Sequence, residues 1–188
     1  MSKTLYDEQQ LIELVQDLAL QTGRFTLASG KTASYYLDCR KLTLDGRGAN
    51  LIAEGILELL TDDLPDVVGG MAIGADPITA AVITVAHQQG HDLKGFIVRK
   101  EAKKHGTARQ VEGPVMPGQR AVVVEDVVTS GGSCLAAIDR AREFGLIVDR
   151  AIAIVDRQEG AAERFSDTGV IFQSLLNIGQ LGIGPAIV

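Results

Sequence analysis

Residues 122–133 read VVVEDVVTSGGS, and this stretch decides how the rest of the chain is interpreted. Three valines precede the adjacent carboxylates Glu125 and Asp126, and the small polar segment Thr129–Ser133 follows them. A short apolar run of this kind is typical of a strand that is buried on both faces of a parallel sheet. The glycines and hydroxyls then lead into a predicted helix that begins near Gly131. The stretch therefore predicts a strand, a loop and a helix, with an acid pair where the strand ends.

The loop in this stretch has the features of a phosphate site. Backbone N–H groups at a helix N-terminus and the helix dipole both favour an anion, and glycines allow it to approach closely. In a parallel sheet, ligands bind beyond the carboxyl ends of the strands, which is where Glu125 and Asp126 lie. Because like charges repel, the carboxylates suit vicinal hydroxyls or a metal ion better than the phosphate. A ribose 5-phosphate carries both kinds of group. The alternative is an ordinary loop with a solvated acid pair.

Apolar runs alternate with helical patterns along the rest of the chain. Further strands are predicted at 67–74, 95–100, 150–156 and 170–175. Helices are predicted over about Asp7–Thr22, around Leu51–Leu59 and from an Asp76 N-cap to about Gln89, and a hairpin or irregular extended segment over 25–45. Strands that alternate with helices favour an α/β fold with a mostly parallel five-stranded sheet flanked by helices.

A long polar stretch, 101–119, follows the strand predicted at 95–100. Four cations and a histidine gather where it begins: Arg99, Lys100, Lys103, Lys104 and His105. Charge runs are usually solvated loops. This one lies in an acidic chain and starts at the same sheet edge as the acid pair, and a loop of this length in a compact domain is usually functional. It suggests a second, more highly charged anionic group, such as a pyrophosphate.

Composition excludes several other classes of protein. The chain has 188 residues, of which 46% are apolar, which indicates one globular domain. Its formal net charge of −6 argues against a general affinity for nucleic acid. Cys39 and Cys134 form neither a disulfide framework nor a metal-ligand pattern. The N-terminus lacks the apolar stretch of a signal peptide, and no apolar run reaches the length of a membrane span. We expect a cytoplasmic protein with no membrane or nucleic-acid partner.

These motifs resemble a known family. VVVEDVVTSGGS resembles the 5-phosphoribosyl 1-diphosphate (PRPP) motif of type I phosphoribosyltransferases, and RKEAKKHG with FTLASGKTASYYLD resembles the orotate phosphoribosyltransferase family. The resemblance runs from about Phe25 to Arg157 and includes VGGMAIGADP and DRQEG. It implies the type I phosphoribosyltransferase fold as a single domain over 1–188. The core would span about 46–156, and a small hood would be formed by about 1–45 and 157–188.

The resemblance also implies an activity. The family makes orotidine 5′-monophosphate and pyrophosphate from orotate and PRPP, a step of UMP biosynthesis. It implies a magnesium-dependent homodimer with shared active sites, in which part of the basic loop reaches the neighbouring subunit. The Mg²⁺ would be bound mainly through PRPP, with no ligand directly from protein side chains.

Individual residues take roles from the same resemblance. The PRPP-binding residues would be Arg99, Lys100, Lys103 and His105 at the pyrophosphate, Glu125 and Asp126 at the ribose hydroxyls, and Val127, Val128, Thr129, Ser130, Gly131, Gly132 and Ser133 around the 5-phosphate. Thr129 and Arg157 would contact orotate, and Lys103 and Asp126 are the catalytic candidates. Arg157 suits a carboxylate because its planar fork can pair with both oxygens. Without the resemblance, a surface salt bridge would be the preferred interpretation of Arg157.

The sequence departs from the family pattern at two positions. Some relatives have a lysine where this chain has Ala28, and some have one near Ile73. The pyrophosphate site therefore lacks two potential cations, and either Lys31 or Lys104 could replace them. Two rival functions stay open. A phosphoribosyltransferase for a purine or another base has less use for Arg157, and a PRPP-sensing regulator that binds nucleic acid would need a basic face.

Overall fold

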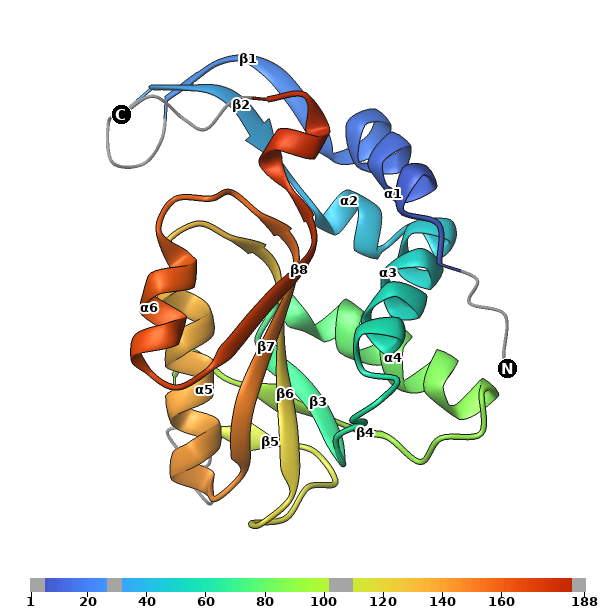
Figure 1. Cartoon of the computed structure of the whole chain (residues 1–188), viewed down its shortest axis with the longest axis vertical. Coiled ribbons are helices and arrows are strands. Elements are labelled where there is room, and N and C mark those ends of the chain that lie inside the picture. Colours follow the sequence, from blue (N-terminus) through green and yellow to red (C-terminus); the bar gives the residue numbers. More distant parts are fainter. Residues whose placement is uncertain (1–5, 27–31, 102–109, 184–188) are drawn as a thin grey trace.

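A six-stranded sheet forms the centre of the computed structural model, which describes residues 6–26, 32–101 and 110–183 (Figure 1). The strands are β3 (Val67–Met71), β4 (Lys94–Val98), β5 (Val111–Glu112), β6 (Arg120–Val128), β7 (Ile147–Asp156) and β8 (Ile171–Asn177). Their order is β5-β4-β3-β6-β7-β8, and every pair is parallel except β4 with β5. The prediction of five mostly parallel strands is confirmed. The two-residue β5 adds a sixth within the stretch predicted to be a polar loop.

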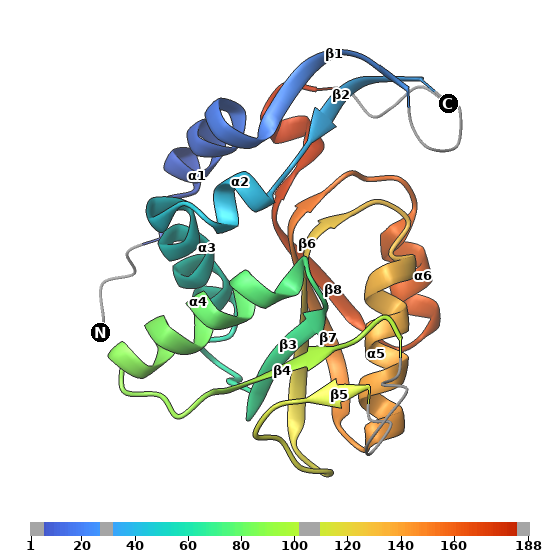
Figure 2. The ribbon, with the colours of Figure 1, turned by 180° about the vertical axis from the view of Figure 1, so that it is seen from behind.

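Helices cover both faces of the sheet. The helices α3 (Gly46–Leu59) and α4 (Ala75–Gln88) pack on one face, and α5 (Gly132–Phe144) and α6 (Ala161–Asp167) lie on the other (Figure 2). The valines of β6 alternate between these layers: Val122 and Val124 belong to the core of α3 and α4, and Val123 to the core of α5. This two-sided burial explains why β6 begins as an uninterrupted apolar run.

The N-terminal segment forms a separate layer above the carboxyl ends of the strands. It comprises α1 (Glu8–Leu14), the π-helix η1 (Val15–Ala19), and the antiparallel hairpin of β1 (Leu20–Thr26) and β2 (Thr32–Leu37), followed by α2 (Arg40–Thr43). Figures 1 and 2 both show the hairpin above the sheet, with the short 3-10 helix η2 (Ile178–Leu181) beside it. Gln16 donates to the Leu181 carbonyl at 3.3 Å, so the N-terminal and C-terminal segments contact each other.

Two predicted boundaries are wrong. The first helix was expected to reach Thr22, but residues from Leu20 onward are extended because they pair with β2, with Leu20 opposite Leu37. Asp76 was expected to cap α4, but the N-cap is Gly74, and Asp76 lies in the first turn. At Leu20 a tertiary contact overrides a valid local pattern. None of the helices in the described ranges combines the length and the apolar character needed to cross a membrane.

Candidate active site

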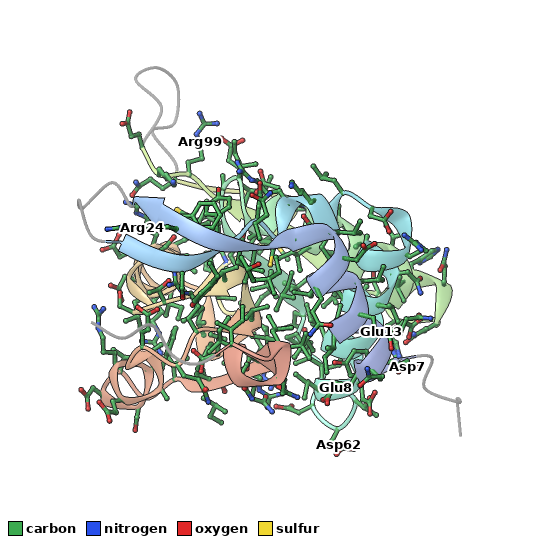
Figure 3. All side chains as sticks on the ribbon, turned by 90° about the horizontal axis from the view of Figure 1, so that it is seen from above. Asp7, Glu8, Glu13, Arg24, Asp62 and Arg99 are labelled. Atoms are coloured by element: carbon green, nitrogen blue, oxygen red, sulfur yellow. The ribbon has the colours of Figure 1, made fainter. Side chains whose placement is uncertain are left out.

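A cleft of about 520 Å³ lies between the carboxyl edge of the sheet and the hairpin layer. It is lined by Tyr36, Leu37, Asp38, Cys39 and Arg40 on one side, by Met71, Ala72, Ile73, Gly74 and Lys100 after β3 and β4, and by Glu125, Asp126, Val127 and Ser133 on the other. Figure 3 looks onto this end of the molecule, where Arg24 of β1 and Arg99 after β4 lie toward the same side. The acid pair, Glu125 and Asp126, therefore lies on the cleft, at the carboxyl edge of the sheet where the sequence predicted it.

The two carboxylates differ in burial. The residue Glu125 is only 7% exposed, and its Oε2 has no hydrogen-bond partner in the described structure, whereas Asp126 is half-buried. Burial, reinforced by the charge of Asp126, raises the pKa of Glu125 to about 7. The Asp126 Oδ1 accepts a hydrogen bond from the Val127 backbone at 2.8 Å, which fixes its direction. Near neutral pH, Glu125 can therefore both donate to and accept from a hydroxyl, beside an oriented acceptor.

The loop after β3 closes against this acid pair. A Cβ placed on Gly74 would lie 3.2 Å from Asp126 Oδ1 and 3.2 Å from Glu125 Oε1, which is tighter than nearly all real contacts. A side chain at position 74 would therefore require the carboxylates to shift, because the backbone approaches them so closely. The neighbouring Ile73 is 75% exposed, and the Ala72–Ile73 peptide bond is cis. This loop therefore presents backbone and an apolar side chain to the cleft.

A smaller hollow of about 180 Å³ adjoins the acid pair at the start of α5. It is lined by Glu125, by all seven residues predicted around the 5-phosphate and by Cys134: Val127, Val128, Thr129, Ser130, Gly131, Gly132, Ser133 and Cys134 follow one another along the chain. The N-cap of α5 is Gly131, whose φ of 79° favours glycine. Backbone N–H groups at this helix end, with no side-chain cap, can receive a phosphate.

Helix α6 supports this hollow from behind. The Arg164 Nη1 donates to the Ser130 carbonyl at 2.7 Å, and a Cβ on Gly131 would lie 3.0 Å from the ring of Phe165. Phe165 is fully buried and stacks on Phe172 of β8, with ring centroids 4.5 Å apart. The shape of the hollow therefore depends on a helix about thirty residues further along the chain.

Only the beginning of the predicted basic cluster can be placed. The Arg99 Nη1 lies 3.2 Å from Glu112 Oε1. The backbone carbonyl of Arg99 accepts a hydrogen bond from Arg140 Nη1 at 3.0 Å. Lys100 lines the cleft and also a neighbouring cavity of about 450 Å³, which Asp76, Ile97 and Glu112 help to line. The other members of the cluster, Lys103, Lys104 and His105, lie outside the described residues, as do Ala28 and Lys31.

Arg157 is held by contacts from the hairpin. Its side chain is 18% exposed, its Nε donates to the Tyr35 hydroxyl at 2.8 Å, and its guanidinium carbon lies 4.9 Å from the Tyr35 ring centroid. Its Nη2 is 2.9 Å from Glu159 Oε1. The backbone N–H of Arg157 donates to the Val128 carbonyl at 2.9 Å, beside Thr129. The Arg157 side chain is therefore an oriented cation next to the phosphate loop, and it also forms a partly buried salt bridge, with Glu159. Neither Thr129 nor Arg157 lines the 520 Å³ cleft itself.

Sequence reasoning missed several residues that shape the site: Tyr35, Asp38, Arg40, Gly74 and Glu159. Two of them, Asp38 and Arg40, lie within the segment 25–45 that was expected to be a hairpin or irregular, and their D-x-R spacing is a signal that could have been followed. Nothing local predicts the contact of Tyr35 with Arg157, because the two residues are 122 positions apart. Within the described part of the chain, no group of three or more potential metal ligands occurs.

The chain is similar in sequence and in structure to known orotate phosphoribosyltransferases. A scan against models of protein families finds no match. A curated orotate phosphoribosyltransferase from Rhodopirellula baltica is 51% identical over 185 residues, which cover 95% of this chain and 96% of that protein. The crystal structure of Mycobacterium tuberculosis H37Rv orotate phosphoribosyltransferase in complex with Fe(III) dicitrate has a TM-score of 0.84 and 41% identity, covering 94% of this chain and 99% of that one. In its complex with PRPP the same protein gives a TM-score of 0.80 and 37% identity, with the same coverage.

Proposed function

The chain belongs to the orotate phosphoribosyltransferase family, and from this premise we propose that it transfers the 5-phosphoribosyl group of PRPP to orotate. The products are orotidine 5′-monophosphate and pyrophosphate, as in UMP biosynthesis. The resemblance noted in the sequence is thereby confirmed at the level of the family. The observation that carries the proposal is the anion-accepting hollow at the start of α5, which directly adjoins the acid pair on the cleft.

The site supports a definite placement of PRPP. Its 5-phosphate would occupy the hollow from Val127 to Ser133, where backbone N–H groups and hydroxyls can donate to it. Its ribose hydroxyls would meet Glu125 and Asp126, and its pyrophosphate would extend into the larger cleft toward Lys100. In the reaction, the orotate ring nitrogen loses its proton to solvent and forms a bond to ribose C1 as the bond from C1 to the pyrophosphate oxygen breaks. Pyrophosphate leaves with the bonding electrons, so no covalent enzyme intermediate is needed.

Magnesium fits this charge distribution. Mg²⁺ prefers oxygen ligands and is commonly held by one or two carboxylates together with substrate phosphates and water. Two carboxylates, Glu125 and Asp126, lie at the proposed ribose position, and no larger cluster of ligands occurs in the described ranges. An ion bound mainly through PRPP would neutralise charge that develops on the leaving pyrophosphate.

The orotate carboxylate is assigned to Arg157 and Thr129. Tyr35 occupies the Nε side of the guanidinium, and Glu159 lies beside Nη2, so the remaining edge of the fork has a fixed direction. A planar fork is suited to a carboxylate, and a neutral purine offers no such group. This preorganised cation favours orotate over the bases of the alternative function.

Further parts of the assignment rest on the family. The basic residues Arg99, Lys100, Lys103 and His105 are assigned to the pyrophosphate, with Lys103 and Asp126 as the catalytic residues. The chain is proposed to be a cytoplasmic homodimer in which the basic loop completes the site of the neighbouring subunit. It is one domain, with a core over about 46–156 and a hood over about 1–45 and 157–188.

Turnover of a panel of bases tests the proposed function. Orotate, uracil and hypoxanthine are each supplied with PRPP and Mg²⁺, and pyrophosphate release is measured. Orotate is expected to react roughly 10- to 150-fold faster than uracil in kcat/KM, because a charge-assisted pair with the orotate carboxylate contributes roughly 1.5–3 kcal/mol. A faster reaction with hypoxanthine would replace the assignment by a purine phosphoribosyltransferase. No turnover with any base would favour the PRPP-sensing regulator.

A further inference from the structure

The cleft has few cations for the group that it is proposed to bind. Three carboxylates line it, from Asp38, Glu125 and Asp126, whereas the positive charges among its described lining residues come from Arg40 and Lys100. At Ile73, where some relatives place a lysine, the side chain is apolar and 75% exposed. A pyrophosphate that enters this cleft needs cations on the wall opposite the acid pair, and Arg40 lies on that wall.

The geometry of Arg40 is set by its own segment. Helix α2 begins at Arg40, directly after β2, and Figure 1 shows it between the hairpin and α3. The Arg40 Nε donates to Asp38 Oδ1 at 2.8 Å and Nη2 donates to Asp38 Oδ2 at 3.0 Å, a bidentate pair that fixes the plane of the fork. No residue of the described ranges accepts a hydrogen bond from Nη1. The guanidinium is therefore oriented and still has donors free for a ligand.

A purely structural role does not account for this arrangement. The side chain of Arg40 is 60% exposed, and exposed ion pairs contribute little to folding stability. The hydrogen bond to Asp38 is the main cause that raises the pKa of Arg40, and the Asp126 carboxylate raises it as well. Since Asp126 lies across the cleft, Arg40 experiences the field of the proposed ribose site. An arginine on the surface outside the cleft would not experience this field.

We propose that Arg40 binds the pyrophosphate group of PRPP and of the product, in place of the lysine that is absent at Ile73. This inference rests on the proposed function, because it assigns one end of the same substrate. Arginine is suited to the task, since its planar fork can donate two parallel hydrogen bonds to phosphate oxygens. Asp38 acts as a positioning residue that holds the fork toward the cleft.

The chain supplies a matched control. Asp45 and Arg47 repeat the D-x-R spacing at the start of α3, with Arg47 Nε 3.5 Å from Asp45 Oδ1 and an arginine side chain that is 71% exposed. Arg47 does not line the cleft. Replacing either arginine removes the same charge from an exposed pair, and only Arg40 is placed to reach the pyrophosphate.

The experiment compares Arg40→Ala, Arg40→Gln and Arg40→Lys with Arg47→Ala. Binding of inorganic pyrophosphate with Mg²⁺ is measured by calorimetry, and KM is measured separately for PRPP and orotate. We expect Arg40→Ala and Arg40→Gln to weaken pyrophosphate binding and to raise the KM for PRPP by roughly tenfold or more, as for the loss of a charge-assisted hydrogen bond. The KM for orotate should change less than about twofold by the same reasoning, since orotate is assigned to Arg157. Arg40→Lys should be intermediate, because it keeps the charge and loses the fork.

Three outcomes are decisive. If wild-type protein turns over orotate and Arg40→Ala behaves like Arg47→Ala in both measurements, the role of Arg40 is overturned and the proposed function stands. If wild-type protein fails to use orotate with PRPP, the proposed function fails and the inference fails with it. Equal losses for PRPP and orotate in both Arg40→Ala and Arg40→Gln would also overturn the inference, because they would indicate a general disturbance of the cleft.

Discussion

The wall of the cleft formed by β6 and α5 is continuous in sequence, whereas the opposite wall is assembled from distant segments. Residues from Glu125 to Ser133 provide both the acid pair and the hollow, and they follow one another along a strand, a loop and a helix start. The opposite side is lined by residues 36–40, by residues 71–74 and by Lys100. Arg157, which lies outside the cleft lining, is oriented by Tyr35 across 122 positions of sequence. The first wall was readable from the chain alone, and the second required the fold.

The two walls also differ in how they hold charge. The β6 wall buries its charge, so that Glu125 is 7% exposed and its pKa rises to about 7. On the hairpin side, a partner fixes the direction of each cation: Asp38 orients Arg40 on the cleft wall, and Tyr35 of the hairpin orients Arg157, which lies beside the phosphate loop and outside the cleft lining. Burial controls protonation on one side, and hydrogen bonding controls orientation on the other. Substitutions on the two walls should therefore affect different substrates and different observables.

The largest effect is expected for Asp126→Asn, on the β6 wall. The substitution keeps the shape and leaves an oxygen to accept from the Val127 N–H, but it removes the charge assigned to a ribose hydroxyl. We expect kcat/KM for PRPP to fall roughly 100-fold, since a hydrogen bond to a charged group contributes up to about 3 kcal/mol. The melting temperature should change little, because Asp126 adds little core packing. Steady-state kinetics measure kcat/KM for PRPP, and a thermal melt measures the melting temperature.

The matched control for this prediction is Asp139→Asn, an exposed aspartate on the helix that follows the hollow. It alters the net charge of the protein by the same amount, away from the cleft lining. If the two variants have the same PRPP kinetics, the acid pair is merely solvated, and the assignment of the ribose to this wall is wrong.

The same contrast explains how much the sequence could predict. The strand, loop and helix at 120–144 were predictable because each depends on neighbours in the chain: an apolar run, a glycine with positive φ and a helix start. The extended conformation of Leu20–Thr22 could not be predicted from the sequence, because the local pattern is helical and the conformation is set by pairing with β2. The short β5 likewise exists through its pairing with Ile97 and Val98. Arg157 could be assigned only through the family, since its orientation comes from Tyr35.

A smaller effect, on stability, is expected for Glu125→Gln. Burial first, and then the charge of Asp126, raises the pKa of Glu125 from its ordinary value near 4.5 to about 7. Between these values the folded protein binds more protons than the unfolded chain, so this group's contribution to stability is present at low pH and is lost as pH rises through about 7. Glutamine has no such titration. The unfolding free energy of Glu125→Gln relative to wild type should therefore rise by on the order of 2 kcal/mol between pH 5 and pH 8.

Urea unfolding at several pH values measures this difference, with Glu143→Gln as the control on an exposed position of α5. That control should follow wild type across the range. A Glu125→Gln curve that runs parallel to the control would mean that burial does not perturb the β6 wall in this way. A difference that grows toward low pH would have the wrong sign and would reject the same idea.

The smallest effect is expected on the hairpin wall, for Tyr35→Phe. The ring stays and can keep its contact with the guanidinium at 4.9 Å, whereas the hydroxyl that accepts from Arg157 Nε at 2.8 Å is lost. A hydrogen bond of this kind contributes about 1 kcal/mol, so the KM for orotate should rise roughly fivefold. The KM for PRPP should stay unchanged, because Tyr35 touches no part of the phosphate hollow.

Tyr6→Phe is the matched control: its hydroxyl is buried without a hydrogen-bond partner in the described structure, so its removal should leave both KM values as they are. A rise in the PRPP KM equal to that for orotate would show that Tyr35 supports the cleft as a whole. The two walls would then form one cooperative unit, and not two independently built surfaces.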